Sequence, residues 1–212
     1  MNNEIAKIYE NIKTPEELMI FMDQYIKYGI HGIDGKDYIP TYGDNESNQK
    51  FQEASFSVYS FGGPSYILKY GLGHCWDQVE LERDWFTKHH YECKTIYIWI
   101  TLDYENSYFT HTVLIYKDNN TYCLFEHADL SNKGIHRFTL YQEALKWLKE
   151  KYIESNKNVG NLINDEIIKN LHIYEYEAPI YGCSANEFLD NIINNAKDIT
   201  NLIEEEDKKW IY

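Results

Sequence analysis

The chain has 212 residues, 43% of them hydrophobic, so it is long and apolar enough to bury a sizeable core. Its 20 basic and 34 acidic residues leave a formal net charge of −14, and we expect nucleic acid and anionic membrane surfaces to repel it. The first residues are polar and acidic, and no hydrophobic run has the length of a membrane span, which predicts a cytoplasmic protein. We expect a single domain over residues 1–212, with a core over 55–150 and a helical C-terminal extension over 151–212.

The N-terminal part opens with a well-marked helix. Thr14-Pro15-Glu16-Glu17 is a capping box with proline at the first helical position, and apolar residues at helical spacing continue toward Gly29. Residues 30–50 carry glycines and a proline among polar residues and are predicted to form a long irregular loop. Residues 55–61 alternate enough to predict a strand, which Gly62-Gly63-Pro64 ends.

The middle of the chain is predicted to be a helix followed by strands. Residues 75–90 carry apolar side chains three or four apart without Pro or Gly, which predicts a helix that starts at Cys75. β-Branched and aromatic residues predict strands over 95–101, 111–117 and 121–126. The second and third of these strands are expected to form a hairpin around residues 118–120.

The C-terminal part is predicted to contain further helices and one strand. Thr139 with Gln142 caps one predicted helix, and another is predicted over 162–171. Residues 173–176 suit a strand, and Ser184-Ala185-Asn186-Glu187 is a second capping box that opens a helix.

The cysteines are expected to be free thiols. They lie far apart in the sequence, which argues against a disulfide framework and a ribbon-type zinc site: Cys75, Cys93, Cys123 and Cys183. Cys93 with His89 or His90 is the basis of a metalloprotein hypothesis, but the sequence offers no second close pair of ligands. We therefore expect neither a metal nor another cofactor.

Cys75 has the sequence context of an activated thiol. It lies in Gly73-His74-Cys75-Trp76-Asp77 at the predicted start of a helix, where the macrodipole and unpaired N–H groups favour a thiolate and can hold an oxyanion. The two glycines before the cysteine, Gly71 and Gly73, let the backbone approach a substrate closely. A buried structural cysteine is the alternative that this local pattern leaves open.

The predicted hairpin brings a histidine and a carboxylate together. If Asp118-Asn119 is the two-residue turn, His111 lies directly opposite Glu126. If the turn is Asn119-Asn120 instead, the two become diagonal neighbours on the same face, and His127 points to the other face in either case. Each could also be an ordinary strand histidine or a solvated edge carboxylate, but the matched pair favours a shared role.

These motifs resemble the transglutaminase-like superfamily, relatives of papain-type cysteine peptidases, over roughly residues 71–128. The resemblance implies an α+β fold with a papain-like or transglutaminase-like core, in which the cysteine helix packs on an antiparallel sheet and extra helices lie at both ends. It also implies that Cys75 is the nucleophile, that His111 is the general base and acid, and that Glu126 orients the imidazole. Glu126 stands where the family usually has aspartate.

The resemblance gives less guidance on substrate contacts. It suggests contacts from residues near the cysteine, with Tyr70 proposed by nearness in sequence alone: Gly73, His74, Trp76 and Tyr70. Ser65 and Tyr66 are further candidates for an oxyanion donor on the same ground. The rest of the substrate pocket is expected from residues 30–50 and from the C-terminal segment.

Two functions from different classes follow. The first is thiol-dependent acyl transfer on a protein or peptide amide, with hydrolysis by a peptidase or amidase expected before cross-linking by an acyltransferase. The second is a non-catalytic module that keeps the fold and binds a protein through its tyrosine-rich surface. A catalytic Cys75 must open into a cleft with His111, whereas a structural one would be sealed by Trp76 or Phe86.

Overall fold

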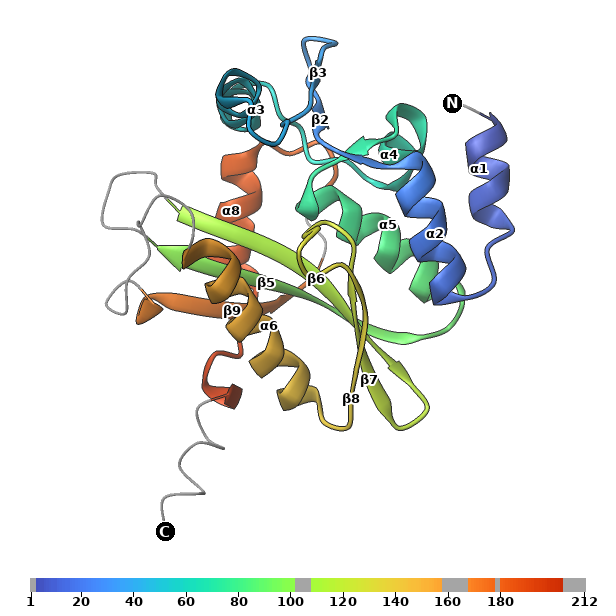
Figure 1. Cartoon of the computed structure of the whole chain (residues 1–212), viewed down its shortest axis with the longest axis vertical. Coiled ribbons are helices and arrows are strands. Elements are labelled where there is room, and N and C mark those ends of the chain that lie inside the picture. Colours follow the sequence, from blue (N-terminus) through green and yellow to red (C-terminus); the bar gives the residue numbers. More distant parts are fainter. Residues whose placement is uncertain (1–2, 102–107, 158–167, 178–179, 204–212) are drawn as a thin grey trace.

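A computed structural model describes residues 3–101, 108–157, 168–177 and 180–203. The fold is α+β, built on a six-stranded antiparallel sheet with the strand order β10-β9-β5-β6-β7-β8 (Figure 1). The strands of this sheet are β5 (Glu92–Thr101), β6 (Tyr108–Asp118), β7 (Thr121–Glu126), β8 (Gly134–Phe138), β9 (Leu171–Tyr176) and β10 (Lys197–Asp198). Two short pairs lie outside the sheet: β1 (Lys27–Tyr28) with β4 (Leu72–Gly73), and β2 (Ile30–His31) with β3 (Asp37–Tyr38).

Helices cover both faces of the sheet. They are α1 (Asn3–Glu10), α2 (Pro15–Tyr25), α3 (Asn45–Ser57), α4 (Pro64–Tyr70), α5 (Cys75–Lys88), α6 (Tyr141–Lys157) and α8 (Ala185–Asn195). On β6, Leu114 and Tyr116 pack into a hydrophobic cluster with α2, α5 and α8, whereas Val113 and Ile115 pack into another with α6. Successive strand residues point to opposite faces, and this alternation separates the two cores. Figure 1 shows α6 lying across the strands.

The start of α5 is held by two reciprocal caps. His74 Nδ1 accepts the backbone N–H of Trp76 at 3.0 Å, and the Asp77 carboxylate accepts the backbone N–H of His74 at 3.1 Å. Asp77 also accepts the Tyr59 hydroxyl at 2.9 Å and the Gly62 N–H at 2.7 Å. A buried carboxylate with several donors fixes the first turn of α5 against the preceding loop.

Several predicted elements are confirmed. A helix starts at Cys75, strands cover 92–101, 108–118 and 121–126, and a strand covers 171–176. Thr14 and Ser184 accept backbone N–H groups at the starts of α2 and α8, as their capping boxes predict. The helix predicted over 162–171 falls mostly outside the described residues, and Leu171 belongs to β9.

Other expectations were wrong in the N-terminal part. Residues 30–50 are not one irregular loop, because they contain the β2–β3 pair and the start of α3. Residues 55–61 are not a strand: α3 continues through Ser57, after a start capped by the Asp44 side chain. Phe51, Ala54 and Val58 have helical spacing and pack in the core, and this outweighed the short alternation at 55–61.

The C-terminal segment is more than a helical extension. Strand β9 pairs with β5 from Thr95↔Tyr176 to Ile100↔Leu171, and β10 adds to its other edge. Strands β9 and β10 therefore complete the sheet that the core strands begin. Within the described ranges, no helix is long and apolar enough to cross a lipid bilayer.

Candidate active site

Cys75 is the first residue of α5, and its surroundings favour a thiolate. Burial alone would raise the pKa of this thiol, but interactions with His111 and His74 outweigh it and lower the pKa to about 6. By contrast, burial raises the pKa of the three other thiols, Cys93, Cys123 and Cys183. All four cysteines are free. Cys75 is therefore the thiol with the most thiolate at neutral pH.

His111 and Glu126 meet, and the hairpin has the second of the two registers that the sequence left open. Strands β6 and β7 pair Asp118 with Thr121 and Leu114 with Phe125, so the turn is Asn119-Asn120 and not Asp118-Asn119. Asn119 has a φ of 54°, a left-handed conformation that asparagine tolerates better than most residues. In this register His111 and Glu126 are diagonal neighbours, and His111 Nε2 donates to Glu126 Oε2 at 2.6 Å.

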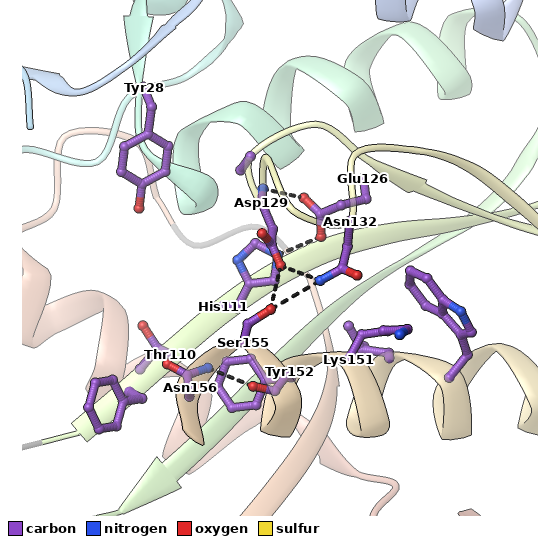
Figure 2. A pocket seen from close by; sticks show the side chains of 14 residues that line it. Tyr28, Thr110, His111, Glu126, Asp129, Asn132, Lys151, Tyr152, Ser155 and Asn156 are labelled. Atoms are coloured by element: carbon purple, nitrogen blue, oxygen red, sulfur yellow. Dashed lines mark hydrogen bonds and ion pairs between the residues drawn. The ribbon is translucent and has the colours of Figure 1, made fainter. Parts of the chain in front are cut away.

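Glu126 is itself held in place on its other oxygen. The backbone N–H of Asp129 donates to Glu126 Oε1 at 2.8 Å, so both carboxylate oxygens accept a hydrogen bond (Figure 2). A proton on His111 Nε2 leaves Nδ1 as the nitrogen that faces Cys75. Burial alone would lower the pKa of His111, but Glu126 and Cys75 outweigh it and hold the pKa well above its usual range. A thiolate–imidazolium pair is the result.

His127 takes a different direction from its neighbour Glu126. Its Nδ1 lies 2.6 Å from Gln78 Oε1 on α5, and its Nε2 lies 3.2 Å from Asp23 Oδ1 on α2. These contacts lie on the face of the sheet that α2 and α5 cover, as the alternation predicts. His127 therefore anchors two helices.

Tyr28 is a site residue that the sequence did not reveal. Strand β1 pairs with β4 so that Tyr28 lies beside Gly73, two positions before the cysteine. Although the residue is 36% exposed, its hydroxyl end interacts with both the thiol and the backbone N–H of Cys75. Burial of that end, and then the charge on Cys75, raise the pKa of Tyr28 well above its usual range. Tyr28 therefore keeps its proton and is a hydrogen-bond donor beside the Cys75 thiol.

The oxyanion donors suggested by nearness in sequence lie elsewhere. The Tyr70 ring stacks on His31 with centroids 3.8 Å apart, and the Tyr66 hydroxyl donates to the backbone carbonyl of His31. Neither these two nor Ser65 is among the described residues that line the cavities beside Cys75. The pairing of β1 with β4 joins residues more than forty positions apart, so no local motif signals Tyr28.

Two cavities flank the thiol and the imidazole. The sulfur-side groove, of about 200 Å³, is lined with Cys75 by His74, Trp76, Phe51, Ser55, Phe109 and Ala185. The imidazole-side cavity, of about 220 Å³, is lined by His111, Glu126, Asp129, Lys151, Tyr152 and Ser155 (Figure 2). Tyr28, Phe109 and Thr110 line both. Cys75 is only 5% exposed, yet it opens into a groove and is not sealed off.

The predicted substrate contacts are placed as follows. His74 and Trp76 line the sulfur-side groove. Gly73 instead packs against the first turn of α5. A Cβ added to Gly73 would lie 3.1 Å from the Asp77 Cβ, and the Gly73 carbonyl accepts a hydrogen bond from Gln78 Nε2 at 2.7 Å. Residues 30–50, expected to line the pocket, do not appear in either cavity lining; α3 after residue 50 and Ala185 take that place.

Glu82 is a buried carboxyl on α5 that the motif did not predict. Its burial, and then the charge of Glu126, raise the pKa of Glu82 well above its usual range. The neutral acid therefore persists to a higher pH than for an ordinary glutamate.

Among the described residues, no group of three or more His, Cys, Asp or Glu side chains is placed to hold a metal ion. Neither a scan against protein-family models nor a search of the curated proteins finds a match to this chain. The function is therefore inferred from the geometry of the site itself.

Proposed function

We propose that this protein is a thiol enzyme that transfers the acyl group of an amide, with water as the expected acceptor, through Cys75, His111 and Glu126. The observation that carries the proposal is the arrangement of the three groups: a thiol with a pKa lowered to about 6, an imidazole beside it, and a carboxylate 2.6 Å from the far imidazole nitrogen. Perturbed protonation in a cleft is typical of functional sites.

In the first step, the Cys75 thiolate attacks the carbonyl carbon of the amide and the carbonyl oxygen becomes an oxyanion. The backbone N–H of Cys75 and the Tyr28 hydroxyl are the donors placed to stabilise it. The His111 imidazolium then gives its Nδ1 proton to the leaving nitrogen, the C–N bond breaks, and a thioester on Cys75 remains.

In the second step, neutral His111 takes a proton from water through Nδ1, and the resulting hydroxide attacks the thioester. The C–S bond breaks, the acid leaves, and the thiolate–imidazolium pair is restored. Glu126 holds the imidazole in one orientation and stabilises its charged form throughout.

A papain-like or transglutaminase-like core is part of the same proposal. A cysteine at the start of a helix that packs on an antiparallel sheet, with a histidine on a neighbouring strand, supports that resemblance. The glutamate in place of the usual aspartate reaches the imidazole across a diagonal pair of strand positions, and its extra methylene suits that longer span.

Acylation by p-nitrophenyl acetate tests the proposal without a known substrate. The expected result is release of p-nitrophenolate with one acetyl group on Cys75, located by mass spectrometry of peptides, and loss of both in Cys75→Ala. A native Cys75 that iodoacetamide modifies but no activated ester acylates would instead support the non-catalytic binding module.

A further inference from the structure

We propose that the two cavities divide the substrate: the sulfur-side groove receives an apolar acyl group and the imidazole-side cavity receives a polar amine. This inference rests on the proposed function. It narrows the substrate to an amide between an aliphatic or aromatic acyl group and an amine that carries hydrogen-bonding groups.

The assignment of sides follows from the stereochemistry of the tetrahedral intermediate. Its carbon is bonded to Cys75 Sγ, and the oxyanion points to the Tyr28 hydroxyl and the Cys75 N–H. The leaving nitrogen must lie beside His111, because that imidazole protonates it. His111 lines only one of the two cavities, so the amine extends into that cavity and the acyl group into the groove lined by Cys75.

The walls of the sulfur-side groove select for an uncharged group. Phe51 and Phe56 from α3, Phe109 from β6 and Ala185 from α8 supply apolar surface. Of the described residues that line it, none is an Asp, Glu, Lys or Arg. His74 is the one basic group among the described side chains of this lining, and it already interacts with Asp77 and Cys75. An acidic acyl chain would therefore lose its hydration there without a free basic partner, whereas an alkyl chain or an aromatic ring would gain from burial.

The imidazole-side cavity differs from the groove in charge, although Trp147 and Leu148 add apolar surface to its wall. Asp129 accepts from Asn132 Nδ2 at 2.7 Å and from Ser155 Oγ at 3.2 Å, so its polar groups are fixed in a network on the cavity wall (Figure 2). Lys151 and Asn156 also line it. Both charge signs and several amide and hydroxyl groups suit an amine that bears its own donors and acceptors.

A series of p-nitrophenyl esters tests the groove. Single-turnover acylation of Cys75 is measured with acetate, hexanoate, phenylacetate and the anionic hemisuccinate, each divided by its rate with free N-acetylcysteine. We expect hexanoate and phenylacetate to acylate Cys75 at least about tenfold faster than acetate, and hemisuccinate to be the slowest.

Matched variants on one helix locate the effect. Ser55→Trp fills the groove and should remove the preference for the longer acyl groups. Ser57→Trp, at an exposed position on α3 outside the groove lining, should leave the relative acylation rates of the four esters unchanged. Gln52→Lys is at an exposed position on the groove wall and should raise the hemisuccinate rate relative to hexanoate even if Ser55→Trp does not fold.

The amine side is tested by the fate of the hexanoyl enzyme. Added glycinamide should compete with water for the acyl group better than butylamine does, and Ser155→Trp should abolish this advantage while the acyl-chain ratios stay as in the wild type. A flat acyl series, or a preference for hemisuccinate, on a labelled Cys75 would overturn this inference and leave the proposed function intact. Failure of every ester to acylate Cys75 would overturn both.

Discussion

At the scale of single residues, the site depends on groups that set one another's charge. Cys75 and His111 each favour the ionised form of the other, and Glu126 stabilises the imidazolium. The same carboxylate discourages ionisation of the nearby Glu82. Burial adds to this effect on Glu82, whose pKa is raised well above its usual range.

Tyr28→Phe should separate oxyanion stabilisation from thiol reactivity. Removing the hydroxyl is expected to slow acylation of Cys75 by p-nitrophenyl acetate about 100-fold, because one donor to the oxyanion is lost. Alkylation by iodoacetamide passes through no oxyanion, so its rate should change much less. Equal slowing of both reactions would mean that Tyr28 serves only to place the thiol.

At the scale of elements, the start of α5 is the part of the fold on which the thiol most depends. Asp77→Ala leaves three buried donors without their acceptor, on Tyr59, Gly62 and His74, and should lower the free energy of unfolding by about 3 kcal/mol. Asp44→Ala removes the exposed cap of α3 and should cost about 1 kcal/mol. Urea unfolding of both variants makes the comparison, and similar small losses would show that Asp77 is not the anchor of α5.

Local patterns predicted the elements that carry their own signals. The capping boxes at Thr14 and Ser184 and the apolar spacing after Cys75 gave helices that the structure contains. The hairpin was predicted with two alternative turns, because two adjacent pairs of turn residues were acceptable, and the structure has the Asn119-Asn120 turn. His111 and Glu126 meet with either turn. Moving the turn by one residue shifts the partner of each strand residue by two positions, which keeps both side chains on the same face of the sheet.

Parts of the site that are formed by residues far apart in the sequence could not be predicted from local patterns. Tyr28 reaches Cys75 through the β1–β4 pair, and the groove joins α3, β6 and α8. The strand predicted over residues 55–61 was wrong. The short alternation there is a weaker signal than the helix cap at Asp44 and the burial of Ala54 on the packed face of α3.

At the scale of the whole molecule, the sheet links residues from both ends of the chain. Leu18 of α2 lies in the core on one face, and Ile173 of β9 lies in the core on the other; both are fully buried. Leu18→Ala and Ile173→Ala should each lower stability by about 2–5 kcal/mol and shift one shared unfolding transition. Ile193→Ala, at a side chain that is 52% exposed, should shift it little. Two separate transitions in thermal unfolding followed by circular dichroism and tyrosine fluorescence would mean that the two cores unfold independently.

We expect Glu126, acting through His111, to keep Cys75 ionised, and the pH dependence of Cys75 alkylation is the measurement that reports on this coupling. Iodoacetamide labelling is read at each cysteine by mass spectrometry in the wild type, His111→Gln, Glu126→Gln and Glu82→Gln. The two glutamates are equally buried, at 3% exposure, which makes Glu82→Gln a matched control. The midpoint of the profile is compared, not the rate, because a thiolate of higher pKa is also more nucleophilic.

We expect labelling of the wild-type Cys75 to fall only as the pH drops through about 6, where the thiolate is protonated. The midpoint should rise in His111→Gln, because His74 alone then opposes the effect of burial on the pKa of the thiol. Glu126→Gln should move the midpoint upward to a lesser extent, and Glu82→Gln should change it least, because the raised pKa of Glu82 disfavours its charged form. A wild-type midpoint at or above that of an ordinary thiol, or one that responds to Glu82→Gln and not to Glu126→Gln, would contradict the account.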